Sequence, residues 1–156
     1  MVDAGWWVLM SYRLPREPST PRIAVWRKLR RLGVAQLSDG LVALPADART
    51  REQLDWIAEE ITELGGMAGV WLAQPGTSRQ ERDLATAMAA ARAAEYDAVL
   101  AAAQQADPAE SSRVVRRLRA ELRRIDRRDY FPPPQRDLAR AAVAELAALR
   151  QVAETT

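Results

Sequence analysis

Arginine side chains are the groups of this 156-residue sequence best suited to chemistry, and that chemistry would be the binding of anions. The chain has 23 basic residues, and Lys28 is the only lysine among them. A guanidinium group is planar and always charged, and it donates paired hydrogen bonds that match a phosphate or another oxyanion. The placement of the arginines is therefore the first functional signal of the sequence.

The first basic segment runs from Arg13 to Gly33. It contains seven basic residues and one acid, Glu17, which gives a local charge of +6. Partners within the segment are therefore few. The segment predicts contacts with the phosphates of a nucleic acid or the capture of a small oxyanion, and the alternative is pairing with an acidic helix or a partner chain. The candidate residues are Arg13, Arg22, Arg27, Lys28, Arg30 and Arg31.

A second arginine-rich segment runs from Asp107 to Phe131. Eight arginines are offset there by five acids, so the local charge is +3. Ion pairs along one helix explain much of this pattern. We expect a second surface for nucleic acid or an oxyanion, with Arg116 and Arg123 as its candidates.

The sequence contains few of the side chains that commonly act in catalysis. It has no cysteine and no histidine, which removes thiolate chemistry, the commonest general base and the usual transition-metal ligands. Glu59, Glu60 and Glu63 could hold a cation, but a solvated helix face is the favoured interpretation. The loop 75–78 could seat an anion at a helix start, although an ordinary loop is favoured. We expect no catalysis, no metal and no cofactor.

Nothing in the sequence predicts export or a membrane span. The apolar stretch from Ala4 to Met10 is short and follows Asp3 rather than a basic segment. No apolar run approaches the ~20 residues of a transmembrane helix. The lack of cysteine gives no sign of an oxidising compartment. We expect a cytoplasmic protein.

The first basic segment must be positioned by the elements around it. Residues 6–14 are rich in β-formers and apolar on both alternating faces, which predicts a central strand covered on both sides. The prolines and hydroxyl residues of 15–21 predict a loop and a helix start, and this helix should run to about Leu32 and end at Gly33. Two short β-prone runs, 34–37 and 41–44, flank Asp39-Gly40 and predict a hairpin.

A second helix and a fourth strand complete this part. Thr50 and Gln53 resemble a capping box at the start of the helix, and residues 67–73 read as the strand. The order strand, helix, strand, strand, helix, strand predicts the ferredoxin-like βαββαβ arrangement of an α+β protein. Tryptophan on a predicted strand or helix face is expected to pack in a core. The five tryptophans are Trp6, Trp7, Trp26, Trp56 and Trp71.

Three helices should follow. Ser78 and Glu81 suggest a capping box for an alanine-rich helix that ends near residue 106, and Asp107-Pro108 restarts the chain. The arginine-rich helix comes next, and after the loop 129–134 the last helix should fold back on it as a helical hairpin. We expect residues 1–77 to form the ferredoxin-like domain. Residues 78–156 should form a helical extension packed on the open face of its sheet.

Several short motifs, taken in order and with their spacing, resemble a known family, the N-terminal domain of the bacterial chromate-resistance protein ChrB. They cover nearly the whole chain. A fainter similarity runs to the middle domain of PaaX-type repressors. The motifs are Trp7 to Met10, Leu14-Pro15, Arg22 to Gly33, Asp39 to Leu41, Leu44-Pro45, Gly65-Gly66, Glu95-Tyr96, Ile125-Asp126 and Asp129 to Pro132.

The resemblance implies a transcriptional regulator of an efflux operon, with DNA and chromate or another oxyanion as ligands. The usual member carries a second, C-terminal domain, so a separately encoded C-terminal half is an expected partner. A small CRISPR adaptation nuclease shares the predicted fold and resembles this chain faintly. Its first strand ends in a metal-binding aspartate after a tyrosine. Here Tyr12 is followed by Arg13, so the resemblance implies no such metal site.

Two hypotheses follow for the function. The first is a regulatory protein that binds DNA and responds to an oxyanion. The second is a protein-interaction module that docks a partner chain, or forms a homodimer, through its helical hairpin. The sequence leaves open the operator, the effector, the partner and the oligomeric state.

Overall fold

A computed structural model of the chain describes residues 5–155; residues 1–4 and 156, with Asp3 and Ala4 among them, lie outside the description. The chain divides into two compact units, Met1–Ala85 and Thr86–Thr156. The boundary expected from the sequence, after residue 77, falls shortly before this division. Packing of the helical extension on the sheet stays a prediction.

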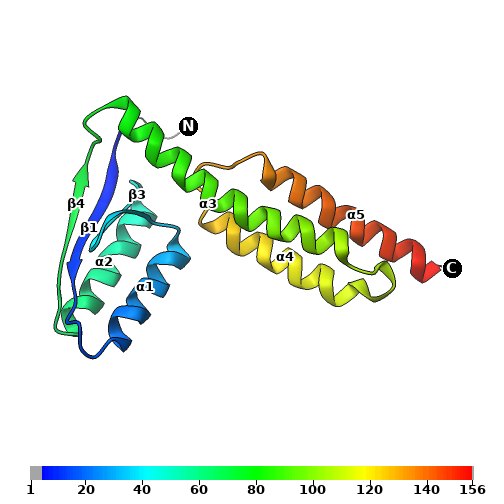
Figure 1. Cartoon of the computed structure of the whole chain (residues 1–156), viewed down its shortest axis with the longest axis horizontal. Coiled ribbons are helices and arrows are strands. Elements are labelled where there is room, and N and C mark those ends of the chain that lie inside the picture. Colours follow the sequence, from blue (N-terminus) through cyan, green and yellow to red (C-terminus); the bar gives the residue numbers. More distant parts are fainter. Residues whose placement is uncertain (1–4, 156) are drawn as a thin grey trace. The chain divides into compact units, whose positions relative to one another are not determined.

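The first unit is built on a four-stranded antiparallel sheet (Figure 1). Its strands are β1 (Trp7–Arg13), β2 (Ala35–Ser38), β3 (Leu41–Pro45) and β4 (Met67–Ala73). Their order is β2-β3-β1-β4, so β1 lies in the interior and pairs with β3 and β4. This is the expected βαββαβ topology, and the α+β ferredoxin-like class is confirmed.

Two helices, α1 (Thr20–Leu32) and α2 (Ala48–Glu63), lie on the same face of the sheet (Figure 1). Their apolar sides meet the inward side of β1, and this interface forms the core of the unit. Gly33 ends α1 in the left-handed conformation, and its amide bonds back to the carbonyl of Arg30. The fully buried members of this core are Val8, Met10, Val25, Leu29, Val42, Leu44, Leu54 and Ile61.

The caps of α2 and α3 differ from those expected. The box of α2 joins Asp47 and Thr50: the Asp47 carboxylate accepts from the Thr50 amide at 2.7 Å, and Thr50 Oγ1 accepts from the Asp47 amide at 3.0 Å. Thr50 and Gln53 therefore do not form it. At α3, Thr77 accepts from the Gln80 amide and Gln80 accepts from the Gly76 amide, one residue earlier than the Ser78 and Glu81 box.

Replacing Asp47 by alanine should lower the free energy of unfolding by about 1 kcal/mol, because the Thr50 amide loses its acceptor at the helix start. Urea denaturation followed by tryptophan fluorescence measures this, since all five tryptophans lie in the first unit. Asp47→Asn keeps an acceptor and should lose much less. Equal losses in the two variants would contradict the role of the cap.

The second face of the sheet is only partly covered. Trp7 is 3% exposed, and Leu9 on the same face is half-buried, so the start of β1 is covered on both sides as expected. Met67 and Trp71 of β4 lie on this face too and are 75% and 60% exposed. Core packing is therefore wrong for three tryptophans, because Trp6, Trp56 and Trp71 are each more than half exposed.

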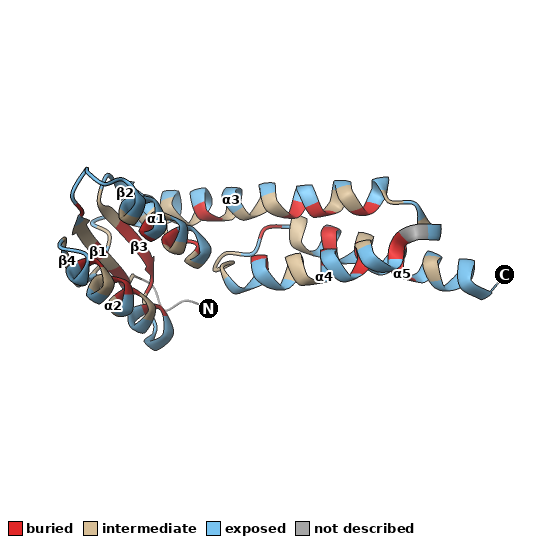
Figure 2. Ribbon diagram, turned by 90° about the horizontal axis from the view of Figure 1, so that it is seen from below, coloured by how far each residue is buried: buried red, intermediate tan, exposed pale blue. Residues whose placement is uncertain are grey.

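The second unit is helical. Its elements are the larger part of α3 (Ser78–Gln105), the short 3-10 helix η1 (Pro108–Glu110), α4 (Ser111–Arg127) and α5 (Gln135–Thr155). Helices α4 and α5 pack as the expected hairpin. Their buried sides share a core with α3 that includes Tyr96, Val115, Ile125 and Val143 (Figure 2). Among residues 5–155 we find no helix with the length and apolarity that crossing a membrane requires.

A candidate anion site beside the first strand and helix

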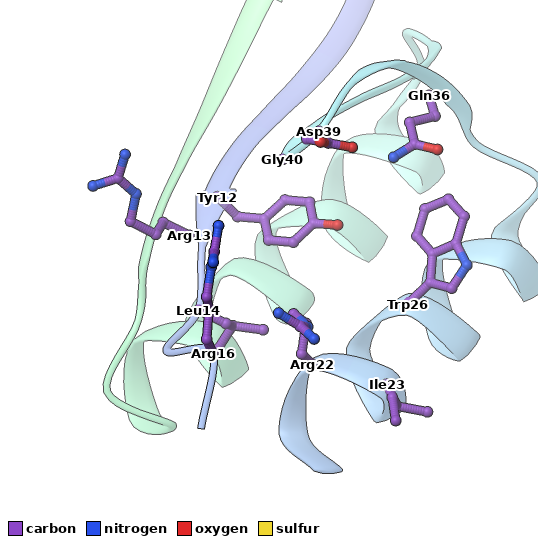
Figure 3. A pocket seen from close by; sticks show the side chains of 10 residues that line it. All are labelled: Tyr12, Arg13, Leu14, Arg16, Arg22, Ile23, Trp26, Gln36, Asp39 and Gly40. Atoms are coloured by element: carbon purple, nitrogen blue, oxygen red, sulfur yellow. The ribbon is translucent and has the colours of Figure 1, made fainter. Parts of the chain in front are cut away.

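A cavity of about 640 Å³ lies between the end of β1, the first turns of α1 and the hairpin of β2 and β3 (Figure 3). It is contained in the first unit. The lining combines cationic, aromatic and hydrogen-bonding side chains. The residues are Tyr12, Arg13, Leu14, Arg16, Arg22, Ile23, Trp26, Gln36, Asp39 and Gly40.

Glycine at position 40 allows the hairpin to close against β1. Gly40 has a φ of 72°, a left-handed conformation that other residues adopt at a cost. Its carbonyl accepts from the Tyr12 amide at 2.8 Å, and a Cβ at this position would lie 2.5 Å from the Tyr12 carbonyl oxygen. The Asp-Gly turn predicted from the sequence therefore places Asp39 and Gln36 on the rim of the cavity beside Tyr12.

The cavity is suited to an anion. Within the described chain, Arg16 and Arg22 make no ion pair and no side-chain hydrogen bond, so both guanidinium groups are available to a ligand. Helix α1 begins at the cavity with Ser19 as its N-cap, which makes no side-chain cap bond, and with no acid in its first turn. The positive end of the helix thus adds to the arginine charge.

Tyr12 contributes a neutral hydrogen-bond donor. Burial, and then the nearby charge of Asp39, raise the pKa of the Tyr12 hydroxyl above its ordinary value. The group therefore stays protonated at neutral pH, and its O–H is free to donate to an anion. Figure 3 shows its hydroxyl directed into the space between β1 and α1, where Arg22 also points.

The structure separates the first set of candidates into two groups. Arg13 and Arg22 both line the cavity, but Arg13 points away from the other side chains (Figure 3). It also borders a second hollow, of about 450 Å³, with Ser11 and Trp71 on the other face of the sheet. The second group, Arg27, Arg30 and Arg31, is exposed along α1.

Lys28 has a partner in the protein. Its Nζ lies 2.6 and 2.7 Å from the two carboxylate oxygens of Glu60 on α2, so for this residue the acidic-helix alternative is observed. Glu59 and Glu63 line a shallow hollow beside β4 together with Asp55. Within residues 5–155 no group of three or more acidic side chains is arranged to hold a metal ion.

Arg116 and Arg123 are exposed on α4 in the second unit and make no ion pair within the described chain. Other arginines of this helix are paired. Arg124 bonds Glu121 three residues earlier, and Arg128 bonds Glu95 of α3. The second arginine-rich segment thus combines an exposed face with internal ion pairs.

The motifs Glu95-Tyr96 and Asp129 to Pro132 meet in space in the second unit. Tyr96 donates to the Asp129 carboxylate at 2.8 Å, and burial followed by this bond raises the pKa of the Tyr96 hydroxyl. Glu95 accepts from Arg128 and lies 2.9 Å from Arg92. Burial lowers the pKa of Arg92, although Glu95 opposes the shift. These bonds fix α3 to the end of α4, so the motifs have a structural role.

Sequence reasoning missed most of the cavity. Arg16 belongs to the basic segment but not to the candidates named from the sequence, whose pattern indicates only strand, helix and turn roles for Tyr12, Trp26, Gln36 and Asp39. The available signal was the hairpin, because folding its turn back toward the first strand places Asp39 beside the basic segment.

Comparison with known proteins bears out the family resemblance of the sequence. The chain matches the family described as "Protein ChrB, N-terminal" over residues 22–109, which are 88 of its 156 residues. It is 29% identical over 131 residues to Protein ChrB of Cupriavidus metallidurans. The match covers 81% of this chain and 40% of that relative, so the chain spans less than half of the relative's length. No solved structure matches the chain.

Proposed function

Because this chain belongs to the family of the ChrB N-terminal domain, we propose that it is a regulatory protein of the chromate-resistance type that contacts DNA through α1 and responds to an oxyanion. The DNA contact is made by the exposed side of the helix. The oxyanion occupies the cavity at its start.

One observation carries the DNA contact. Helix α1 contains no acidic residue and exposes Arg27, Arg30 and Arg31, none of which forms an ion pair within the described residues. A row of guanidinium groups without acidic neighbours on one helix is suited to the electrostatic contacts that proteins make with the phosphates of a nucleic acid. Lys28 is less available, because Glu60 holds its ammonium.

The response to an oxyanion is supported by the cavity. Arg16 and Arg22 supply guanidinium forks, and the Tyr12 hydroxyl supplies a further donor beside the positive end of α1. Because Arg22 belongs to the same helix as the exposed row, an anion on Arg22 lowers the positive potential that the row presents to DNA. The proposed effect of the oxyanion is therefore weaker DNA binding.

The test is a fluorescence-anisotropy titration of a short DNA duplex at low salt. The wild type should bind in the micromolar range, with a slope of log affinity against log salt of about −2.7 for three phosphate contacts at about 0.9 each. Changing Arg27, Arg30 and Arg31 together to glutamate should abolish measurable binding. The variant loses the three phosphate contacts, each of which contributes about 0.9 to the slope, and the new carboxylates repel phosphate.

A second triple variant controls for net charge. Arg51, Arg79 and Arg82 are exposed residues of the first unit outside α1, and changing them to glutamate alters the total charge equally. This control should retain most of the affinity. An equal loss in both variants, or no salt-dependent binding by the wild type, would remove α1 from the proposal. Adding chromate at constant ionic strength then tests the oxyanion response.

A specific observation favours the second candidate function, a protein-interaction module. Helix α5 exposes Leu138 and Leu149, which are 56% and 48% exposed. A hairpin with exposed leucines is suited to docking a partner chain, such as a separately encoded C-terminal half, or a second copy. The same titration separates the candidates, because this one requires no salt-dependent affinity for DNA.

A further inference from the structure

The cavity beside α1 is much larger than the anion that the proposed function places in it. Its volume is about 640 Å³, within the range of about 300 to 1,000 Å³ usual for organic ligands. An ion of four oxygens displaces on the order of three waters at about 30 Å³ each, so it fills a small part of this space. The rest of the cavity is lined by side chains that a small oxyanion would not contact.

Those walls carry the chemistry that recognises a nucleobase. Trp26 is half-buried and offers an aromatic face, and Tyr12 adds a second ring. Stacking on such side chains is the common way in which proteins hold an unstacked base. Figure 3 shows Trp26 rising from α1 toward Gln36, across the space from Tyr12. The aromatic part of the cavity is thus continuous with its arginine part.

The rim of the cavity supplies hydrogen-bonding groups that favour guanine over adenine. The Asp39 carboxylate accepts only, which suits the two adjacent N–H donors of guanine, whereas adenine would present a ring-nitrogen acceptor to it. The Gln36 amide has an NH₂ that suits the guanine carbonyl. Within the described chain, neither side chain forms an ion pair or a side-chain hydrogen bond, so both are available.

We propose that the cavity binds a guanine nucleotide, with the base between Trp26 and Tyr12 and the phosphate on Arg16 and Arg22. The nucleotide is either free or an unstacked nucleotide of a nucleic-acid strand. This inference rests on the anion seat of the proposed function and extends it, because it assigns the other side of the cavity to the base.

Isothermal titration of the whole protein tests the proposal with five probes: GMP, AMP, guanosine, ribose 5-phosphate and inorganic phosphate. GMP should bind at least tenfold more tightly than each of the others, because it alone uses both the base and the phosphate contacts. A single-stranded oligonucleotide with an unpaired guanine distinguishes a free nucleotide from one in a nucleic-acid strand. If the oligonucleotide competes with GMP, the cavity accepts both. If the oligonucleotide binds and GMP does not, the ligand is a nucleotide of a strand.

Variants locate the binding. Arg22→Gln should weaken GMP at least tenfold, and Asp39→Asn should reduce the preference for GMP over AMP. Trp26→Leu should weaken GMP about tenfold, in keeping with the loss of a stacked base. Arg51→Gln is the matched control, since Arg51 is an exposed arginine of the first unit that lies outside the cavity and outside the proposed DNA contact. It should leave GMP binding unchanged.

Two results would overturn the inference. Inorganic phosphate that binds as tightly as GMP, with no effect of Trp26→Leu, would reduce the cavity to a small-oxyanion site and leave the proposed function intact. Failure of both GMP and the oligonucleotide to bind at millimolar concentration would reject a nucleotide. Circular dichroism of Trp26→Leu checks its fold, and the exposed Arg22 and Asp39 variants decide the question if that variant does not fold.

Discussion

Replacing Gly66 by alanine should lower the free energy of unfolding of the first unit by about 3 kcal/mol, the upper part of the usual range for overpacking. A Cβ at Gly66 would lie 2.4 Å from the Arg13 carbonyl oxygen, and 2.9 and 3.0 Å from side-chain carbons of Ile61 and Leu14. The nearest atom belongs to the backbone of Arg13, the last residue of β1, which is paired with Met67 at the start of β4. It has little freedom to move away.

Urea denaturation followed by tryptophan fluorescence measures this loss. Gly76→Ala is the matched control, because a Cβ there meets only the Gln80 side chain, at 3.7 Å. Its unfolding free energy should stay within about 0.5 kcal/mol of the wild type. A Gly66→Ala variant as stable as this control would mean that the end of β1 yields easily, against the packing described here.

Replacing Glu95 by alanine should lower the stability of the second unit by about 3 kcal/mol. Glu95 is the carboxylate shared by Arg92 and Arg128, whose side chains are only 14% and 16% exposed. Without the Glu95 carboxylate, the guanidinium groups of Arg92 and Arg128 remain close together, largely shielded from water and without this shared counter-charge. Removing one partner of a buried ion pair costs about 3 to 5 kcal/mol, and the partial exposure of Glu95 places this case at the lower end.

The measurement is urea denaturation followed by circular dichroism, which reports on the helices. Glu154→Ala serves as the control: Glu154 pairs with Arg150 at 3.1 Å four residues earlier but is 62% exposed. Loss of such a surface pair should cost less than about 0.5 kcal/mol. Identical denaturation midpoints for the two variants would show that the Glu95 bonds do not hold α3 to α4.

Fold class was accessible from the sequence because its signals are local. Periodicity, the Asp39-Gly40 turn and the stop at Gly33 are each set by a few neighbouring residues, and the strand 67–73 was predicted with the bounds observed. The caps were predicted one to three residues late. Several serine and threonine residues near a helix start can each form a capping box, and only the backbone geometry decides which of them does.

The site was less accessible because it depends on pairings between distant segments. Lys28 belongs to a run of basic residues, yet it is paired with Glu60, thirty-two positions away. Arg16 lies in a loop without periodicity, and its neighbourhood exists only after the hairpin closes on β1. Trp56 and Trp71 were assigned to a core by residue type, although a strand at the edge of the sheet and an outer helix face leave them exposed.

The Lys28 and Glu60 pair gives the chain a single chemical reporter. Apart from the amino terminus, Lys28 carries the only primary amine, and both oxygens of the Glu60 carboxylate hold it. An acylating reagent reacts with this amine only when it is released from the carboxylate, so the rate of labelling at this one position reports how often the pair breaks. Mass spectrometry of the labelled protein thus measures the breaking of this ion pair on the helix that we propose to meet DNA, without any engineered probe.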